Sequence, residues 1–137
     1  AAVKKYLPDY HTLIMAAAPS DYKPVEEADQ KLKKQGASGL TIELTQTPDI
    51  LKEVAKIRKE NQTIIGFAAE TEKLLENGLR KLQEKDLDFI VCNDVSQAGS
   101  GFNSDTNTIT ILGENHQEDF PSMDKEDVAD KILDLLR

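Results

Sequence analysis

The sequence predicts an α/β fold in which helices cover both faces of a mainly parallel sheet. Three short apolar runs, at 12–18, 63–69 and 87–92, have the length and composition of strands buried on both faces. Helical patterns separate these runs, and strands that alternate with helices pair in parallel through right-handed crossovers. The chain has 137 residues and 39% apolar content, which suits one domain around one modest core.

The first third of the chain is predicted to hold a helix, a strand and a long loop. Residues 1–7 are good helix formers that stop at Pro8. No initiator Met and no capping residue precede them, so we expect an upstream part of the domain to be missing, with a processed native terminus as the alternative. The strand at 12–18 leads into a polar segment, 21–39, that we expect to be a long mobile loop.

Two more strands with a helix between them are predicted in the middle of the chain. Residues 40–44 alternate apolar and polar side chains, which predicts a strand with one face toward solvent. Thr47 is the predicted N-cap of a helix that starts at Pro48, because proline suits the first helical turn. The apolar stripe of this helix consists of Ile50, Leu51, Val54 and Ile57. The buried strand at 63–69 then follows.

From residue 70 onward the pattern predicts a helix, two strands and a final helix. The first helix is expected to run to about residue 85 and to be weakened by Gly78, because glycine is a poor helix former. A glycine-containing loop follows the buried run at 87–92, and 108–112 alternates as a strand does. An amphipathic helix over 124–136 ends the chain.

Charge and composition exclude several classes of protein. The net charge of −8 argues against general binding to nucleic acid or to anionic membranes. No apolar run reaches the roughly 18 residues of a membrane span, and no segment resembles a signal peptide. The single cysteine, Cys92, excludes an internal disulfide framework and fits a reducing compartment. We therefore expect a cytoplasmic protein without nucleic-acid or membrane partners.

Common cofactor and metal motifs do not fit this sequence. The glycines of 99–101 lack the third glycine and the helix of a dinucleotide site, and there is no phosphate-binding P-loop. Side chains at calcium-loop spacing are interrupted by Thr108, where that loop requires glycine. His11 and His116 have no partner at the spacing of zinc ligands. Cys92 lies in an apolar run without an adjacent base, which is typical of an inert core thiol.

Polar residues follow three of the predicted strands and indicate a ligand site. These strand tails are 19–21, 70–71 and 93–94. In parallel sheets ligands bind outside the carboxyl ends of the strands. Lys81 and Lys85 are four residues apart, so both can point from one helix face toward the phosphates of a single ligand. A second lysine group, on the long loop, consists of Lys31, Lys33 and Lys34. Either group taken alone is typical of a solvated surface.

Six short blocks in this order resemble the phosphopantothenoylcysteine synthetase family, the phosphopantothenate–cysteine ligases of coenzyme A biosynthesis. The blocks are Met-Ala-Ala-Ala-Pro-Ser-Asp-Tyr at 15–22, Lys-Leu-Lys-Lys at 31–34, Pro-Asp-Ile-Leu at 48–51, Gly-Phe-Ala-Ala-Glu-Thr at 66–71, Asn-Asp-Val at 93–95 and Gly-Phe-Asn-Ser-Asp at 101–105. The resemblance implies a Rossmann-like three-layer sandwich without its N-terminal strand–helix unit. Residues 1–137 would then be the C-terminal part of the synthetase domain of the bacterial bifunctional flavoprotein. FMN would belong only to a fused decarboxylase domain outside this chain.

The resemblance also implies an activity and a set of site residues. The family joins 4′-phosphopantothenate to cysteine, and its bacterial members use CTP with Mg²⁺, pass through an acyl cytidylate and release pyrophosphate and CMP. Lys31 matches the loop lysine that closes on the intermediate. The implied CTP-binding residues are Met15, Ala16, Ala17, Asp21, Lys31, Pro48, Asp49, Ile50, Leu51, Phe67, Lys81 and Lys85. A homodimer is implied, whereas no metal ligand is assigned.

The sequence departs from the family in ways that leave a second function open. Thr47 stands where members commonly have Asn, and Pro19-Ser20 where small apolar residues are common. The family's Gly-rich phosphate-binding turn and its substrate-binding Asn precede this segment, so the sequence leaves the activity of this chain alone open. The alternative function is a non-catalytic nucleotide-binding or regulatory module on the same fold. A nicotinamide oxidoreductase is disfavoured because the dinucleotide fingerprint is absent.

Overall fold

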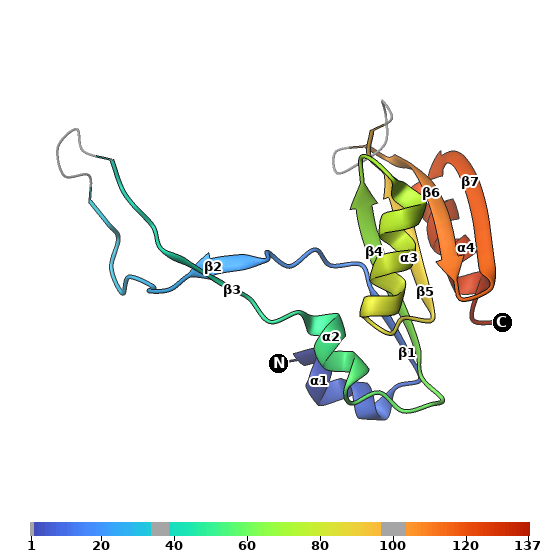
Figure 1. Ribbon diagram of the computed structural model, residues 1–137, viewed down its shortest axis with the longest axis horizontal. Helices are drawn as coiled ribbons and strands as arrows, with labels where there is room; N and C mark the ends of the chain where they lie inside the picture. Colours follow the sequence, from blue (N-terminus) through green and yellow to red (C-terminus); the bar gives the residue numbers. More distant parts are fainter. Residues whose placement is uncertain (1, 34–38, 97–103) are drawn as a thin grey trace.

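The computed structural model describes residues 2–33, 39–96 and 104–137. Its body is a five-stranded sheet with the strand order β1-β4-β5-β6-β7 (Figure 1). The strands are β1 (Thr12–Met15), β4 (Thr63–Glu70), β5 (Phe89–Asp94), β6 (Thr106–Gly113) and β7 (His116–Asp124). β1, β4 and β5 run parallel, whereas β6 and β7 form an antiparallel hairpin at the other edge.

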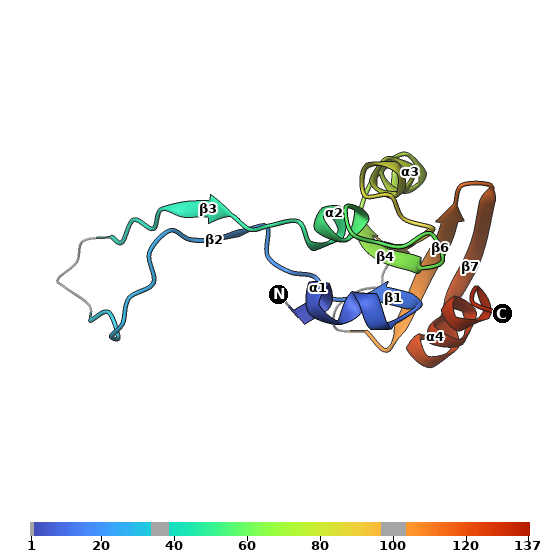
Figure 2. The ribbon, with the colours of Figure 1, turned by 90° about the horizontal axis from the view of Figure 1, so that it is seen from below.

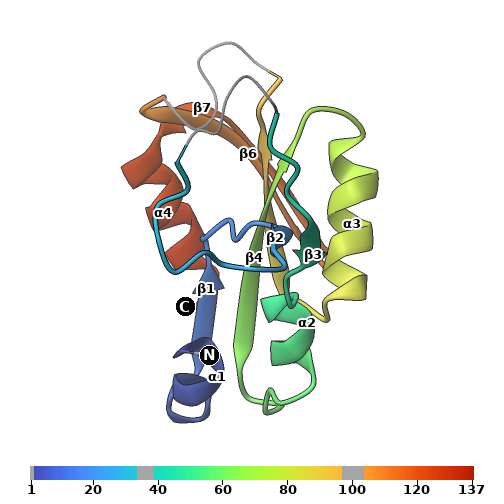
Figure 3. The same ribbon diagram turned by 90° about the vertical axis from the view of Figure 1, so that its left-hand side faces the viewer.

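Helices cover both faces of this sheet, which confirms the predicted three-layer α/β fold (Figure 2, Figure 3). α2 (Ile50–Ala55) and α3 (Leu74–Glu84) lie on one face, and α4 (Lys125–Asp134) lies on the other. The short α1 (Ala2–Tyr6) continues as a 3-10 turn, η1 (Leu7–Asp9). Lys4 Nζ donates a hydrogen bond to Glu53 Oε2 at 2.9 Å, which ties α1 to α2.

The core consists of two apolar clusters, one on each face of the sheet. Successive strand residues point to opposite faces, so Ile64 and Ile65 belong to different clusters. The cluster under α2 and α3 includes Leu51, Val54, Ile64, Leu82, Ile90, Cys92 and Leu112. The cluster under α4 includes Ile65, Val91, Ile109, Ile111, Val128 and Ile132. Burial on both faces fixes β4 and β5 as the central strands.

Gly78 allows α3 to lie close to the sheet. A Cβ atom at this position would lie 2.5 Å from Cys92 Sγ and 2.7 Å from Leu112 Cδ1, and both of these side chains are fully buried. Real Cβ atoms essentially never approach other heavy atoms so closely. The glycine that lowers helix propensity is therefore the residue that permits the packing of α3 on β5 and β6.

A two-stranded antiparallel arm projects from the body (Figure 1, Figure 2). It pairs β2 (Tyr22–Pro24) with β3 (Leu44–Gln46), and Val25 N donates to Glu43 O at 3.0 Å beyond the two strands. The prediction that 21–39 is loop throughout is therefore wrong at its start, because β2 lies within it. Residues 34–38 lie outside the described part of the chain.

The strand predicted at 40–44 is displaced to β3, and its apolar side chains are not buried. Leu40 is 70% exposed, Ile42 is 58% exposed and Leu44 is 54% exposed. Alternation of apolar and polar side chains predicts extended backbone, but it does not determine whether another element covers the apolar side. The expected half-buried strand is thus an exposed strand of the arm.

Two further element boundaries differ from the predictions. β1 ends at Met15 rather than at residue 18, and Ile14 is 37% exposed because β1 lies at the edge of the sheet. α2 begins at Ile50 with Asp49 as its N-cap, so the predicted cap at Thr47 and start at Pro48 are wrong. An aspartate side chain can accept from the first backbone N–H groups of a helix as readily as threonine can.

The remaining differences concern the later elements. Ile57 lies beyond the end of α2 and is 46% exposed, so it is not part of the apolar stripe. The helix expected to follow residues 70–71 is α3, which starts at Leu74 because β4 continues to Glu70. β7 was not predicted, since its sequence is polar, contains Pro121 and buries only Phe120. These properties are typical of an edge strand.

Candidate functional site

A cavity of about 380 Å³ opens at the carboxyl ends of β1 and β4. Ligands bind at this end of parallel sheets, and small-molecule sites have volumes of roughly 300–1,000 Å³. Its walls come from the end of β1 and the loop after it, from the start of α2, from β4 and from α3. The lining residues are Met15, Ala17, Ala18, Pro19, Ser20, Asp21, Thr47, Pro48, Asp49, Ile50, Leu51, Phe67, Ala68, Ala69, Lys81 and Lys85.

Hydrogen bonds at the base of the arm hold the loop after β1 against the segment that leads into α2. Thr47 N donates to Asp21 O at 2.9 Å, and Thr47 Oγ1 donates to Ser20 O. Ser20 Oγ also donates to Tyr22 O at 2.9 Å. Thr47 therefore joins the two ends of the arm instead of capping a helix, and this junction forms one wall of the cavity.

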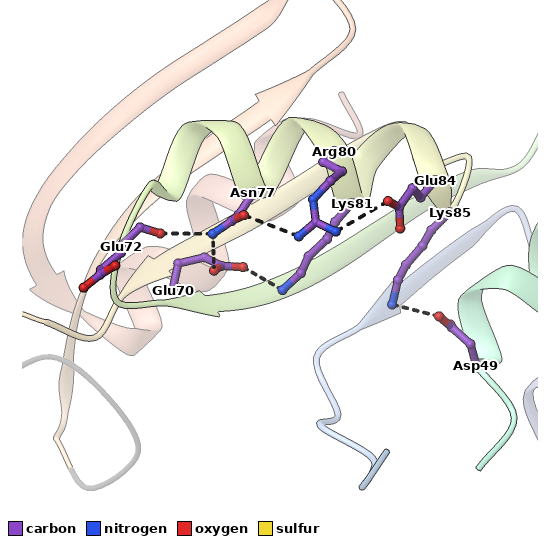
Figure 4. A network of polar contacts seen from close by, with 8 residues as sticks. All are labelled: Asp49, Glu70, Glu72, Asn77, Arg80, Lys81, Glu84 and Lys85. Carbon is purple, nitrogen blue, oxygen red and sulfur yellow. Dashed lines mark hydrogen bonds and ion pairs between the residues drawn. The ribbon is translucent and has the colours of Figure 1, made fainter. Parts of the chain in front are cut away.

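Asp49 and Lys85 form an ion pair at the cavity wall. Asp49 Oδ1 accepts from Lys52 N at 3.2 Å as the N-cap of α2, and Asp49 Oδ2 lies 3.1 Å from Lys85 Nζ (Figure 4). Partial burial raises the pKa of Asp49, but the hydrogen bond from Lys52 N and the Lys85 ammonium together outweigh it and lower that pKa. Asp49 therefore carries its negative charge at neutral pH beside the Lys85 ammonium.

Glu70 and Lys81 form a second and more buried ion pair. Lys81 Nζ lies 2.6 Å from Glu70 Oε1, and Asn77 Nδ2 donates to Glu70 Oε2 at 3.2 Å (Figure 4). The side chain of Glu70 is only 11% exposed, whereas that of Lys81 is 33% exposed and lines the cavity. The polar tail at 70–71 was noted from the sequence, but this pairing depends on how α3 folds back along β4 and has no sequence signal of its own.

Ten of the twelve residues implied by the resemblance line this one cavity. Ala16 lies in the loop after β1 but not on the cavity wall, and Lys31 lies on the arm, outside the wall. Lys33 is likewise an exposed arm residue, and Lys34 lies outside the described residues. The structure thus gathers the lysines of α3 with the ends of β1 and β4, but it does not bring Lys31 or Lys33 to them.

The third polar strand tail lies apart from the cavity wall. Asn93 Nδ2 donates to Asn107 Oδ1 at 3.4 Å, and Asp94 Oδ1 accepts from Ser96 N at 3.0 Å. The segment 97–103, which contains the glycines of the loop and part of the sixth resemblance block, lies outside the described residues. Of the three tails noted from the sequence, only 19–21 lines the cavity directly.

The thiol of Cys92 is buried, as expected for a structural cysteine. Cys92 is fully buried, and burial, with the Glu70 charge, raises its pKa to about 11. Across 2–33, 39–96 and 104–137, no group of three or more His, Cys, Asp or Glu side chains is placed to hold a metal ion. Within those same ranges, the helices are all too short or too polar to span a bilayer.

Comparisons with known proteins agree on one family. The family model described as DNA/pantothenate metabolism flavoprotein C-terminal domain matches residues 1–137. The Coenzyme A biosynthesis bifunctional protein CoaBC of Bacillus subtilis (strain 168) is 45% identical over 122 residues, which are 88% of this chain and 30% of that protein. A Cysteine/Cysteine sulfinic acid decarboxylase from an unknown prokaryotic organism is 40% identical over 121 residues, 88% of this chain and 33% of that protein.

A solved structure supports the same relationship. The crystal structure of the C-terminal domain of Coenzyme A biosynthesis bifunctional protein CoaBC superimposes with a TM-score of 0.76 at 31% sequence identity. The match covers 98% of this chain and 57% of that chain. The chain spans about a third of the length of the curated relatives it matches.

Proposed function

Because this chain belongs to the family of DNA/pantothenate metabolism flavoprotein C-terminal domains, we propose that it is part of a ligase of coenzyme A biosynthesis. The ligase joins 4′-phosphopantothenate to cysteine and uses CTP. The proposed compartment is the cytoplasm, because a single buried cysteine fits reducing conditions.

The observation that carries this proposal is the cavity at the carboxyl ends of β1 and β4. Two lysines of one helix face, Lys81 and Lys85, line it together with the loop after β1. Ammonium groups bind phosphate oxygens, and the position matches the end at which parallel sheets bind nucleotides. A nucleoside triphosphate is the ligand class that combines such phosphates with a base large enough to fill the apolar part of the wall.

The proposed reaction has two steps. A carboxylate oxygen of phosphopantothenate attacks the α-phosphorus of CTP, the bond from that phosphorus to the bridging oxygen breaks, and pyrophosphate leaves. The amine nitrogen of cysteine then attacks the acyl carbon, the bond from that carbon to the CMP oxygen breaks, CMP leaves, and the nitrogen gives up a proton to solvent as the amide forms. Neither step needs a nucleophile from the protein. Both need aligned substrates and positive charge near the phosphates, which lysines can supply.

Three residues have proposed roles in holding the nucleotide and the intermediate. Asp21 lines the cavity and can accept hydrogen bonds from a ribose hydroxyl or a base amino group. Phe67 is half-buried in the wall and offers a flat apolar surface to the base. Lys31 would reach the acyl phosphate only when the arm carries it toward the cavity, a closing motion of the kind that completes many active sites.

Mg²⁺ is proposed to enter with CTP rather than to occupy a protein cage. The carboxylates on the cavity wall are Asp21 and Asp49, and Asp49 is engaged with Lys85. One or two carboxylates beside substrate phosphates are the usual surroundings of Mg²⁺, which keeps several water ligands. The two carboxylates fit that role, in which the metal neutralises phosphate charge.

We also propose that two copies of the chain associate through the arm. Exposed apolar side chains gather there, and they are Tyr22, Val25, Leu32, Leu40, Ile42 and Leu44. Contiguous exposed apolar surface marks interaction sites. Sedimentation equilibrium should give a dimer for the wild type and a monomer for the Leu40→Ser, Ile42→Ser double variant. A double variant that stays dimeric with an unchanged circular dichroism spectrum would exclude this part of the arm as the interface.

One relative favours a second candidate function. The decarboxylase-named protein that is 40% identical to this chain has a name unconnected with coenzyme A biosynthesis. If that protein uses its domain of this family without ligase catalysis, the domain would act as a nucleotide-binding or regulatory module, and this chain could do the same. This candidate predicts nucleotide binding by the longer protein but no formation of phosphopantothenoylcysteine.

Calorimetric titration of the chain with CTP, ATP and UTP in the presence of Mg²⁺ tests the proposal. Selective binding of CTP supports the ligase, and incubation of the longer protein with phosphopantothenate, cysteine and CTP should then release pyrophosphate. Binding without turnover in the longer protein favours the regulatory module. Absence of binding both by this chain and by the longer protein contradicts both candidates.

A further inference from the structure

We propose that Glu70 is a positioning residue that holds the Lys81 ammonium at the cavity wall, ready for a phosphate group. This inference rests on the proposed nucleotide site and goes beyond it, because Glu70 itself does not line the cavity. Glu70 ends β4, and Lys81 lies on α3, which folds back along the sheet. The pair therefore fixes a flexible cationic side chain to a rigid strand.

The Glu70 carboxylate is held from two sides. Its Oε1 accepts from Lys81 Nζ at 2.6 Å, and its Oε2 accepts from Asn77 Nδ2 at 3.2 Å. Asn77 Nδ2 also donates to Glu72 O at 3.1 Å, so the amide is itself anchored to the turn before α3 (Figure 4). A carboxylate with one partner on each oxygen has little freedom to rotate. Lys81 thus meets a fixed acceptor.

Burial places Glu70 behind Lys81 with respect to the cavity. The side chain of Glu70 is 11% exposed and that of Lys81 is 33% exposed. A lysine ammonium has three donors, so Lys81 can keep its bond to Glu70 and direct the others toward a ligand. The Asp49–Lys85 pair differs, because Asp49 lines the cavity and would meet the same ligand directly. Glu70 can therefore persist as a support when an anion binds.

Two opposing effects of Glu70 must be weighed. Anchoring Lys81 removes the entropy cost of ordering a long side chain on binding, which strengthens binding. The negative charge of Glu70 weakens the attraction of Lys81 for an anion. Glutamine separates the two, because it carries no charge and keeps a carbonyl oxygen for Lys81, while it loses only the longer bond from Asn77 Nδ2, which an amide nitrogen cannot accept. If anchoring dominates, Glu70→Gln should bind CTP nearly as tightly as the wild type does, whereas Glu70→Ala should bind CTP weakly. If charge dominates, both variants bind more tightly.

The test is a double-mutant cycle for CTP binding in the presence of Mg²⁺, measured by calorimetry. We expect Glu70→Ala to raise the Kd about tenfold, near the upper end of the cost of ordering one long side chain on binding. Because Glu70 acts through Lys81, the same change should have no further effect in the Lys81→Met background. Glu76→Ala on the same helix is the matched control, since Glu76 Oε2 lies 3.3 Å from the Nζ of the exposed Lys73 and Glu76 does not line the cavity. It should leave the Kd unchanged.

A second readout needs no nucleotide. Brief acetylation followed by peptide mapping measures how readily each lysine reacts. An ammonium held in an ion pair reacts more slowly, because only the neutral amine is nucleophilic. Lys81 should react several-fold faster in Glu70→Ala than in the wild type, relative to the exposed Lys125 as an internal reference. Glu76→Ala should leave the Lys81 rate unchanged. Equal Lys81 rates in the wild type and in Glu70→Ala would overturn the inference whether or not CTP binds.

The outcomes distinguish the inference from the proposed function. If neither this chain nor the longer protein binds nucleotide but the Lys81 acetylation difference is seen, the nucleotide site is contradicted and the hold of Glu70 on Lys81 is still supported. In another outcome, the wild type binds CTP while Glu70→Ala weakens that binding equally with Lys81 present and in the Lys81→Met background. That result overturns the inference and leaves the nucleotide site standing. Tighter binding by Glu70→Gln overturns it as well. If Glu70→Ala does not fold, the Gln variant still decides between anchoring and charge.

Discussion

Replacement of Gly78 by alanine should destabilise the protein, although alanine is the best helix former. The added methyl group would lie 2.5 Å from Cys92 Sγ and 2.7 Å from Leu112 Cδ1, and both of these side chains are fully buried. Overpacking of this kind costs about 1–3 kcal/mol, and two contacts under 3 Å place it in the upper half of that range. The gain in helix propensity returns about 1 kcal/mol. We therefore expect a net loss of about 1–2 kcal/mol in the free energy of unfolding.

Urea unfolding followed by circular dichroism measures this loss. Gly39→Ala is the matched control, because a Cβ at Gly39 meets no atom within 4 Å. That variant should be unchanged or slightly more stable, since alanine restricts the unfolded chain. Cys92→Ala combined with Gly78→Ala should recover part of the loss, because one of the two close contacts disappears. A Gly78→Ala protein as stable as the wild type would refute the argument that this glycine sets the distance between α3 and the sheet.

Three further predictions concern charge, the thiol and the arm. The pKa of Asp49 is lowered in the folded state, so its ion pair stabilises the protein above pH about 4 and stabilises it less as the pH falls. Asparagine at this position keeps the helix cap but carries no charge. Between pH 6 and pH 3 the free energy of unfolding should therefore fall less in Asp49→Asn than in the wild type, with a difference under about 1 kcal/mol. Cys92, with its pKa raised to about 11, should react with a disulfide reagent at pH 8 only as fast as the protein opens, and fast labelling would contradict its burial. Lys31→Gln in the longer protein should keep CTP binding and slow turnover about a hundredfold or more, because an electrostatic contact to the reacting group is lost. Undiminished turnover would exclude the role proposed for Lys31.

The fold was predictable wherever apolar runs are buried on both sides. The runs at 63–69 and 87–92 became the central strands β4 and β5, because nothing but a covered sheet accommodates continuous apolar segments of that length. The arm and β7 were less predictable, since both depend on what lies beside them. β7 is polar along most of its length and is recognisable as a strand only through its pairing with β6.

The candidate site was predictable for a different reason. Residues at the ends of parallel strands converge by topology, so the tail at 19–21 and the lysines of α3 could be expected near one another. Their ion-pair partners could not, because Lys81 reaches Glu70 across eleven positions and Lys85 reaches Asp49 across thirty-six. Such distances depend on where α3 begins, and the sequence pattern indicates only the approximate start of that helix.

The arm also bears on how this domain can change over evolution. Thr12 pairs with Thr63 in the parallel sheet, so the chain between them forms a closed loop that contains the whole arm. The entropy of closing a loop grows only with the logarithm of its length, and doubling the loop costs about 0.6 kcal/mol. Insertions and deletions in the arm should therefore barely affect the stability of the body. Selection on its length therefore acts through what the arm contacts and not through the stability of the body.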